Sequence, residues 1–275
     1  MRQPIPLRHL ATACLLSLAA LWPGARAAQP IVAGSLADSP PMIADAGHGR
    51  PLRGVLVDLA AAMSRYLPAP IEFRPQASAG LLAALHSHRI DVAFTLMHDT
   101  SAREQRVDFI DFFHLGTRLL VRHGNPQHVK DLHSLCGKAV ATLRGSTQLD
   151  LVTRASEWCT ARRKPPLTVL QFARVAQARR QLRAGHVVAL LGDSPAMLYL
   201  AHNTDGGHLF ALAGPEYQPV PVGIAVPRNR PKLREELQVA LQKVIDDGSY
   251  LKILRRYGVQ GGAVHAARID AGAAS

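Results

Sequence analysis

Three stretches of the sequence place polar side chains where an apolar strand is expected to end and a helix to begin. The first stretch, residues 97–104, fits a helix-capping box and places Arg103 in the first helical turn, where its charge opposes the helix dipole. Bidentate binding of a carboxylate would explain an arginine at this position, at the carboxyl end of a strand where open α/β sheets bind ligands. A surface arginine paired with Asp99 or Asp108 is an equal alternative.

The second stretch, residues 141–148, runs from a strand through Gly145 into a helix that begins at Ser146 and Thr147. Free backbone N–H groups at a helix start make a small anion site. The spacing of a P-loop is absent, so a nucleotide is not expected. An ordinary capped turn is the commoner use of such a sequence.

The third stretch ends an apolar strand at Asp193, just before Pro195 at the expected first turn of a helix. A plain helix cap would account for Asp193. As a functional group, its carboxylate could accept a ligand ammonium.

The sequence contains none of the metal-binding, catalytic or dinucleotide-binding motifs that we searched for. The thirteen histidines include no His-Glu-x-x-His pair, and neither a Gly-x-Ser-x-Gly elbow nor a Gly-x-Gly-x-x-Gly turn occurs. The sequence therefore predicts no metal site, no cofactor and no catalytic residue.

The elements that must position these groups alternate between short apolar strands and amphipathic helices, which predicts an α/β fold with largely parallel sheets. The pattern restarts near Lys130, after a turn-rich segment, and this suggests two α/β lobes. Residues 261–275 are small and polar and are expected to form a frayed tail. The expected strands are residues 31–34, 71–73, 90–94, 119–122, 139–142, 167–170, 187–191 and 224–226.

The N-terminal 27 residues have the pattern of a secretory signal peptide. Two arginines precede an apolar run over residues 10–21, and Ala25 and Ala27 supply small residues before a cleavage site at Ala28. The run is too short to span a bilayer, and a buried N-terminal helix is the alternative. We therefore expect an exported protein that is soluble in the periplasm after cleavage.

Composition and charge limit the partners. The 275 residues are 48% hydrophobic and 19% charged, a globular composition with room for one large domain or two small ones. Without residues 1–27, 29 Lys and Arg stand against 20 Asp and Glu, a net charge of +9. The basic residues are scattered, so we expect a solvated face that favours anionic ligands rather than a nucleic-acid site.

The cysteines point to one disulfide. Cys14 belongs to the signal segment, which leaves Cys136 and Cys159. An even pair in an oxidising compartment favours a bond that stabilises by about 3 kcal/mol. Two buried thiols or a redox pair are alternatives, although the wide spacing argues against redox chemistry.

In their order and spacing, these stretches resemble the family 3 periplasmic solute-binding proteins of polar amino acid ABC importers, in the branch that carries a cysteine pair. The similarity extends over about residues 31–258. The segments that carry it are residues 54–60, 85–91, 97–103 with 107–113, 135–138 with 145–148, and 247–258.

The resemblance implies a type II periplasmic binding protein fold, with two α/β lobes joined by two hinge strands that close on a ligand. Lobe 1 would comprise residues 28–113 plus 222–275, lobe 2 residues 119–215, and the hinges about residues 113–118 and 216–221. It further implies a monomer that carries a small solute, most simply an amino acid or related carboxylate, to the membrane permease of an ABC importer.

The resemblance also assigns the site. The family's carboxylate-binding arginine falls on Arg103, its second-lobe helix start on Ser146 and Thr147, and its ammonium partner on Asp193, so both charges of an α-amino acid would be met. Three further ligand-binding positions complete the site, two of which depart from the family pattern. They are Met97, His98 where the family has threonine, and Ser78 where an aromatic side chain is usual.

Two alternatives stay open. A sensory adaptor could present a small carboxylate to a receptor on the same fold. An enzyme similar to cyclohexadienyl dehydratases would need an acidic residue close after Asp193, and Ser194, Pro195 and Ala196 offer none. We therefore expect a binding protein rather than an enzyme.

Overall fold

The computed structural model describes residues 29–36, 38–45, 51–76 and 80–274, so the signal-peptide prediction falls outside it. A nine-stranded mixed sheet has the order β4-β1-β5-β10-β6-β9-β7-β8, and β11 pairs with β6. Its strands are β1 (Ile31–Ser35), β4 (Ile71–Pro75), β5 (Val92–His98), β6 (Val107–Arg122), β7 (Ala139–Leu143), β8 (Thr168–Phe172), β9 (Ala189–Asp193), β10 (Phe210–Pro227) and β11 (Arg268–Ile269).

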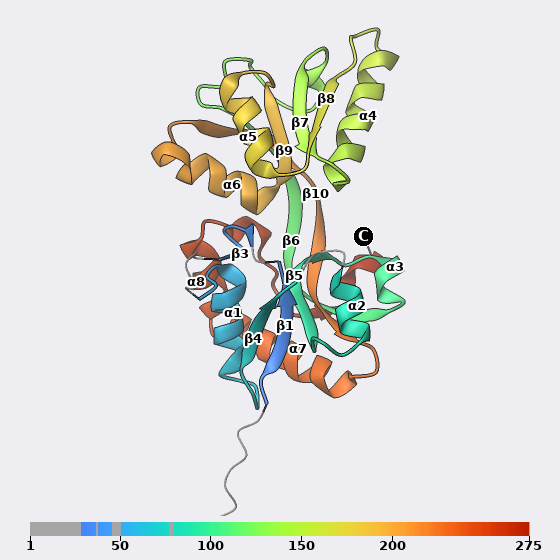
Figure 1. The fold of residues 1–275 in the computed structure, drawn as a ribbon, viewed down its shortest axis with the longest axis vertical. Coiled ribbons are helices and arrows are strands. Elements are labelled where there is room, and N and C mark those ends of the chain that lie inside the picture. Colours follow the sequence, from blue (N-terminus) through green and yellow to red (C-terminus); the bar gives the residue numbers. More distant parts are fainter. Residues whose placement is uncertain (1–28, 37, 46–50, 77–79, 275) are drawn as a thin grey trace, which may run out of the picture.

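Figure 1 shows two bodies joined by β6 and β10, which run through both. We call the body with β1, β4 and β5 lobe 1 and the body with β7, β8 and β9 lobe 2. The helices of lobe 1 are α1 (Val55–Ser64), α2 (Leu81–His86), α3 (Ser101–Glu104), α7 (Pro231–Asp246) and α8 (Ser249–Arg256). Those of lobe 2 are α4 (Thr147–Ala161), α5 (Val175–Ala184) and α6 (Ser194–Asn203). A two-stranded sheet, β2 (Asp38–Ser39) with β3 (Ile43–Ala44), completes lobe 1.

Each lobe buries its own apolar residues. In lobe 1, Leu56 and Leu59 of α1 join Leu237 and Leu241 of α7 in one core. In lobe 2, two clusters are centred on Val140 and on residues of α5 and α6, on the two sides of the sheet. The separate cores make each lobe a unit that can keep its packing if the other moves.

The mixed α/β class is confirmed, but the sheet is less parallel than predicted. In lobe 1, β1 runs parallel to β4 and β5, and in lobe 2 β7 runs parallel to β8 and β9. The long strands β6 and β10 are antiparallel to each other and to β9 and β5, respectively. A chain that crosses from one lobe to the other and then returns must run in opposite directions in its two crossing strands. A local hydrophobic pattern does not record the direction of a strand.

The prediction of a frayed C-terminal tail is wrong for residues 261–274. Val264 and Ala267 are buried in the core of lobe 1, and β11 pairs with β6 at Asp111 and Ile110. The backbone of Ala271 donates to Asp111 Oδ2 at 3.1 Å, and that of Gly272 donates to Asp99 Oδ2 at 2.8 Å. Carboxylates distant in sequence thus accept hydrogen bonds from backbone N–H groups of residues 261–274, a segment that we call the C-terminal strap.

The segment where β6 and β10 cross between the lobes is irregular. Their pairing shifts register between Ala213 and Tyr217 and again before Val220. Gln218 has φ 48°, a left-handed conformation that a non-glycine residue rarely adopts. The predicted hinges lie within this region, but the lobe bounds and the bending itself stay predictions.

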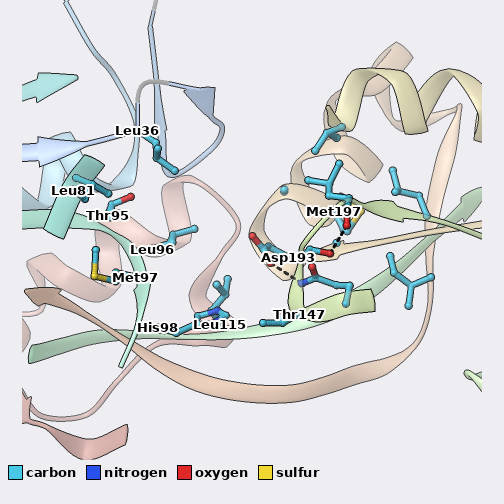
Figure 2. Close-up of a pocket in the computed structure, with 18 of the residues that line it drawn as sticks. Leu36, Leu81, Thr95, Leu96, Met97, His98, Leu115, Thr147, Asp193 and Met197 are labelled. Atoms are coloured by element: carbon cyan, nitrogen blue, oxygen red, sulfur yellow. Dashed lines mark hydrogen bonds between the residues drawn. The ribbon is translucent and has the colours of Figure 1, made fainter. Parts of the chain in front are cut away.

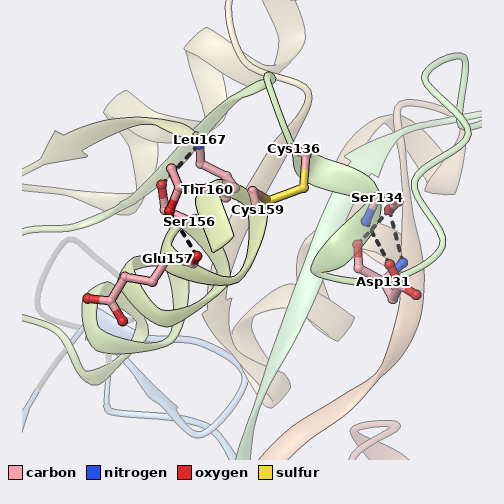
Figure 3. The surroundings of a disulfide bond; sticks show 8 residues. All are labelled: Asp131, Ser134, Cys136, Ser156, Glu157, Cys159, Thr160 and Leu167. Atoms are coloured by element: carbon pink, nitrogen blue, oxygen red, sulfur yellow. Dashed lines mark hydrogen bonds between the residues drawn. A yellow bond between two sulfur atoms is a disulfide. The ribbon is translucent and has the colours of Figure 1, made fainter. Parts of the chain in front are cut away.

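The predicted disulfide is confirmed. Cys136 and Cys159 are joined with a Cα–Cα distance of 5.7 Å, which ties the segment before β7 to the last turn of α4 (Figure 3). Beside it the ring of Trp158 stacks on His133, with ring centres 3.8 Å apart.

Candidate functional site

A cleft of about 300 Å³ opens where the carboxyl ends of strands from both lobes meet. Figure 2 shows Leu36, Leu96 and Met97 of lobe 1 on one side and Asp193 and Thr147 of lobe 2 on the other. The lobe 1 wall comprises Leu36, Leu81, Leu82, Thr95, Leu96, Met97, His98, Arg103 and Leu115. The lobe 2 wall comprises Leu143, Ser146, Thr147, Gln148, Val175, Leu190, Leu191, Gly192, Asp193, Ala196 and Met197.

Arg103 is half-buried on α3, immediately after β5 delivers the chain to the cleft. Its Nη1 donates to the backbone carbonyl of His98 at 2.7 Å. Within the described residues Arg103 forms no ion pair, and Asp108 is paired instead with Arg228 and Arg234. The surface-pair alternative is therefore wrong, and most of the five guanidinium donors remain for a ligand.

Asp193 stands across the cleft at the end of β9. It precedes α6 as the N-cap residue but makes no side-chain capping bond, so a plain helix cap does not account for its carboxylate. Its Oδ1 accepts a hydrogen bond from Gln148 Nε2 at 2.8 Å. Burial raises the pKa of Asp193, and the Gln148 bond and the nearby His98 only partly offset this. This carboxylate lacks a cationic partner of its own among the described residues.

His98 lies near both charged groups. Burial lowers the pKa of its imidazole, the Asp193 carboxylate raises it, and the Arg103 guanidinium lowers it further. A lowered pKa favours the neutral ring near pH 7, so His98 adds hydrogen-bonding capacity to the cleft rather than a second fixed positive charge.

The start of α4 holds Ser146 and Thr147, the two residues whose N–H groups are predicted to bind an anion from lobe 2. Ser146 donates its Oγ to the Leu143 carbonyl at 2.8 Å and its backbone N–H to the same oxygen at 3.3 Å. The N–H of Thr147 has no acceptor within the described residues. Of the two N–H groups expected from the sequence, the one at Thr147 is therefore available to an anion.

Comparison with known proteins decides the family. The model of the bacterial extracellular solute-binding proteins, family 3, matches residues 31–260. The chain belongs to this family.

Individual relatives and a solved structure are similar to this chain over most of its length. Arginine-binding protein ArgT of Corynebacterium glutamicum is 29% identical over 220 residues, which cover 79% of this chain and 70% of ArgT. The L-arginine-binding protein of Pseudomonas aeruginosa is 27% identical over 259 residues, covering 91% and 96% of the two chains. The solved structure of an ancestral arginine-binding protein bound to arginine is 31% identical, with a TM-score of 0.66 over 83% of this chain and 97% of that one.

These findings confirm the resemblance drawn from the sequence, the two-lobed type II fold and a solute-binding function. They agree with an extracellular or periplasmic location, since the family is an extracellular one. Among the described residues no helix is both long and apolar enough to cross a bilayer.

The structure brings together six of the seven predicted ligand-binding residues of this solute-binding protein. Five of them, namely Met97, His98, Arg103, Ser146 and Thr147, line the same cleft as Asp193. Ser78 lies outside the described residues.

Two features of the cleft were not predicted from the sequence. They are Gln148 and the leucine wall, the name we give to the lobe 1 side chains Leu36, Leu81, Leu82 and Leu96. Gln148 Nε2 donates to Asp193 and also lies 3.3 Å from Thr117 Oγ1 on β6. It belongs to the second stretch by sequence, but its reach to Asp193 depends on the packing of α4 against β7, which pairs with β9. The leucines come from three separate elements, and each of them is typical of an ordinary core residue.

Proposed function

We propose that this solute-binding protein captures an α-amino acid outside the cytoplasmic membrane and delivers it to the permease of an ABC importer. The ligand carboxylate binds Arg103 from lobe 1 and the Thr147 N–H from lobe 2. The ligand ammonium binds Asp193. The names of the relatives, which are amino acid binding proteins, support this class of ligand.

One observation carries the proposal. A half-buried arginine and a half-buried carboxylate, neither with an ion-pair partner among the described residues, face the same cleft from opposite lobes. A buried charge is costly unless it is paired, so the cleft favours a ligand that brings one group of each sign. An α-amino acid does so on neighbouring atoms.

Because the two groups stand on different lobes, binding and closure are coupled. The ligand gains its full set of contacts only when both walls reach it, so it shifts the molecule toward the closed form. The irregular crossing of β6 and β10 is the place where we expect bending.

Binding rather than catalysis is supported by the acid inventory of the cleft. Among its described lining residues Asp193 is the only carboxylate, and Ser194, Pro195 and Ala196 follow it. An enzyme similar to cyclohexadienyl dehydratases would need an acidic residue close after Asp193, and none of these three residues is acidic. We propose a monomeric binding protein whose partners are its ligand and the permease, without nucleic acid.

Calorimetric titration of the chain without residues 1–27 against the common α-amino acids tests the proposal. At least one should bind, and Arg103→Ala should weaken it by about 30-fold or more, since removing a buried charge partner costs about 2–5 kcal/mol. The matched control is Arg106→Ala, one turn further on and exposed. Equal affinity of Arg103→Ala and the unmodified chain would refute the carboxylate assignment.

A further inference from the structure

After the ligand's two charges are paired, the described lining of the cleft offers no further carboxylate. Asp193 is the one carboxylate among the described lining residues, and the proposed function assigns it to the ammonium. A ligand with a cationic side chain would therefore place that charge in the cleft without a partner, which is unfavourable.

The lobe 1 wall is made largely of leucine. Leu36 follows β1, Leu81 and Leu82 begin α2, and Leu96 lies near the end of β5. Leu81 belongs to a core cluster of lobe 1, whereas Leu36, Leu82 and Leu96 are only half-buried and line the cleft. Figure 2 shows Leu36 and Leu96 on this wall.

Two buried side chains also belong to this wall. Met97 and Leu115 line the same cleft as the half-buried Leu36, Leu82 and Leu96. Half-buried apolar side chains at the mouth of a cleft, supported by a packed core, are typical of a site that binds an apolar group.

Polar side chains on this wall are few. Apart from Arg103 and His98, Thr95 is the one described residue of this wall whose side chain offers a hydrogen-bonding group, and it is 4% exposed. One hydroxyl cannot satisfy a carboxamide, which needs both donors and acceptors. An uncharged polar side chain would leave hydrogen bonds unmade, at a cost in affinity.

We infer that the cleft selects an α-amino acid with an uncharged aliphatic side chain, such as leucine, isoleucine, valine or methionine. The inference rests on the proposed function, because it takes Arg103 and Asp193 as the groups that bind the ligand's carboxylate and ammonium. It separates this chain from the relatives whose names specify arginine.

Calorimetric titration of the chain without residues 1–27 with leucine, methionine, valine, glutamine, lysine and arginine measures the selectivity. We expect the tightest aliphatic amino acid to bind at least about 10-fold more tightly than arginine, lysine or glutamine, since even one methylene group in an apolar pocket is worth about that factor.

A charge placed in the wall sharpens the test. Leu36→Asp adds a carboxylate at a half-buried position, where water can hydrate it in the empty cleft. We expect this variant to bind leucine more weakly and to bind arginine about 10-fold or more tightly than the unmodified chain. The uncharged Leu36→Asn should also bind leucine more weakly, but its affinity for arginine should not rise. Leu82→Glu, in the first turn of α2, serves the same purpose if Leu36→Asp does not fold.

Leu170→Asp is the matched control, because Leu170 is 38% exposed on β8 and does not line the cleft. It should leave both affinities unchanged. If arginine, lysine or glutamine binds the unmodified chain more tightly than every aliphatic amino acid, the inference is wrong while the proposed function stands. If no α-amino acid binds, both are wrong.

Discussion

The two walls of the cleft are built from different chemistry. Among the described residues, lobe 1 offers a leucine surface with one cation, Arg103. Lobe 2 offers a carboxylate without an ion-pair partner, Asp193, and a helix start with a free N–H at Thr147. Neither wall can satisfy both charges of an amino acid. Under the proposed function, charge recognition is divided between the lobes, and under the further inference the selection of the side chain falls mainly to lobe 1.

The lobes also differ in how they are held together. Lobe 2 carries the disulfide, which fixes α4 to the segment before β7. Lobe 1 carries the C-terminal strap, whose backbone is held by the buried carboxylates of Asp99 and Asp111. One lobe is therefore stabilised by a covalent link and the other by groups that titrate.

The largest expected effect separates the two charged walls. Asp193→Asn should weaken binding of the amino acid by about 30-fold or more, because it removes the partner of the ammonium at a cost of about 2–5 kcal/mol. The test also uses an analogue of the ligand, the same carboxylic acid without its amino group. Asp193→Asn should leave binding of this analogue nearly unchanged, whereas Arg103→Ala should weaken binding of the amino acid and of the analogue. Calorimetry measures all four affinities.

Asp150→Asn is the control for charge alone, since Asp150 is exposed in the first turn of α4. If Asp193→Asn weakens the analogue as much as the amino acid, Asp193 does not bind the ammonium and the division of charges between the walls fails.

The disulfide should matter to lobe 2 alone. Replacing Cys136 and Cys159 together by alanine should lower the free energy of unfolding by about 3 kcal/mol, because the unfolded chain regains the freedom of the closed loop. Hydrogen exchange should accelerate in α4 and β8 and stay unchanged in α1 and α7. A reduced but unmodified chain is the control for the substitutions, and uniform acceleration in both lobes would contradict independent cores.

The smallest effect concerns lobe 1 and pH. Burial raises the pKa of Asp99 to about 7 and that of Asp111 to about 6. Both values lie above the ordinary carboxyl value of about 4, so the folded state binds more protons between about pH 4 and 7. The free energy of unfolding contributed by these groups therefore falls as pH rises through that window.

Asp111→Asn removes one of these titrations. Its Tm should decline less than that of the unmodified chain between pH 5 and 8, by roughly 2–4 °C, the shift that about 1 kcal/mol produces in a protein of this size. Asp150→Asn controls for net charge. Identical pH slopes for Asp111→Asn and the unmodified chain would show that the strap carboxylates do not titrate in this range.

The sequence by itself determined the local parts of this protein. Apolar runs and capping residues located most helices and strands, since these depend on neighbours a few positions away. It also placed Arg103 and Asp193 at the carboxyl ends of strands, where parallel strands deliver ligand-binding groups to one edge. The cysteine count and the export pattern sufficed for the disulfide.

Tertiary structure alone decided what depends on distant pairing. The full length of β6 and β10, the strap on Asp99 and Asp111, and the bond from Gln148 to Asp193 join residues that lie 45 to 173 positions apart or follow from such contacts. The leucine wall is likewise made by three elements that only the sheet order brings together. Periodicity records which face of an element is apolar, but it does not record which other element, or which ligand, that face meets.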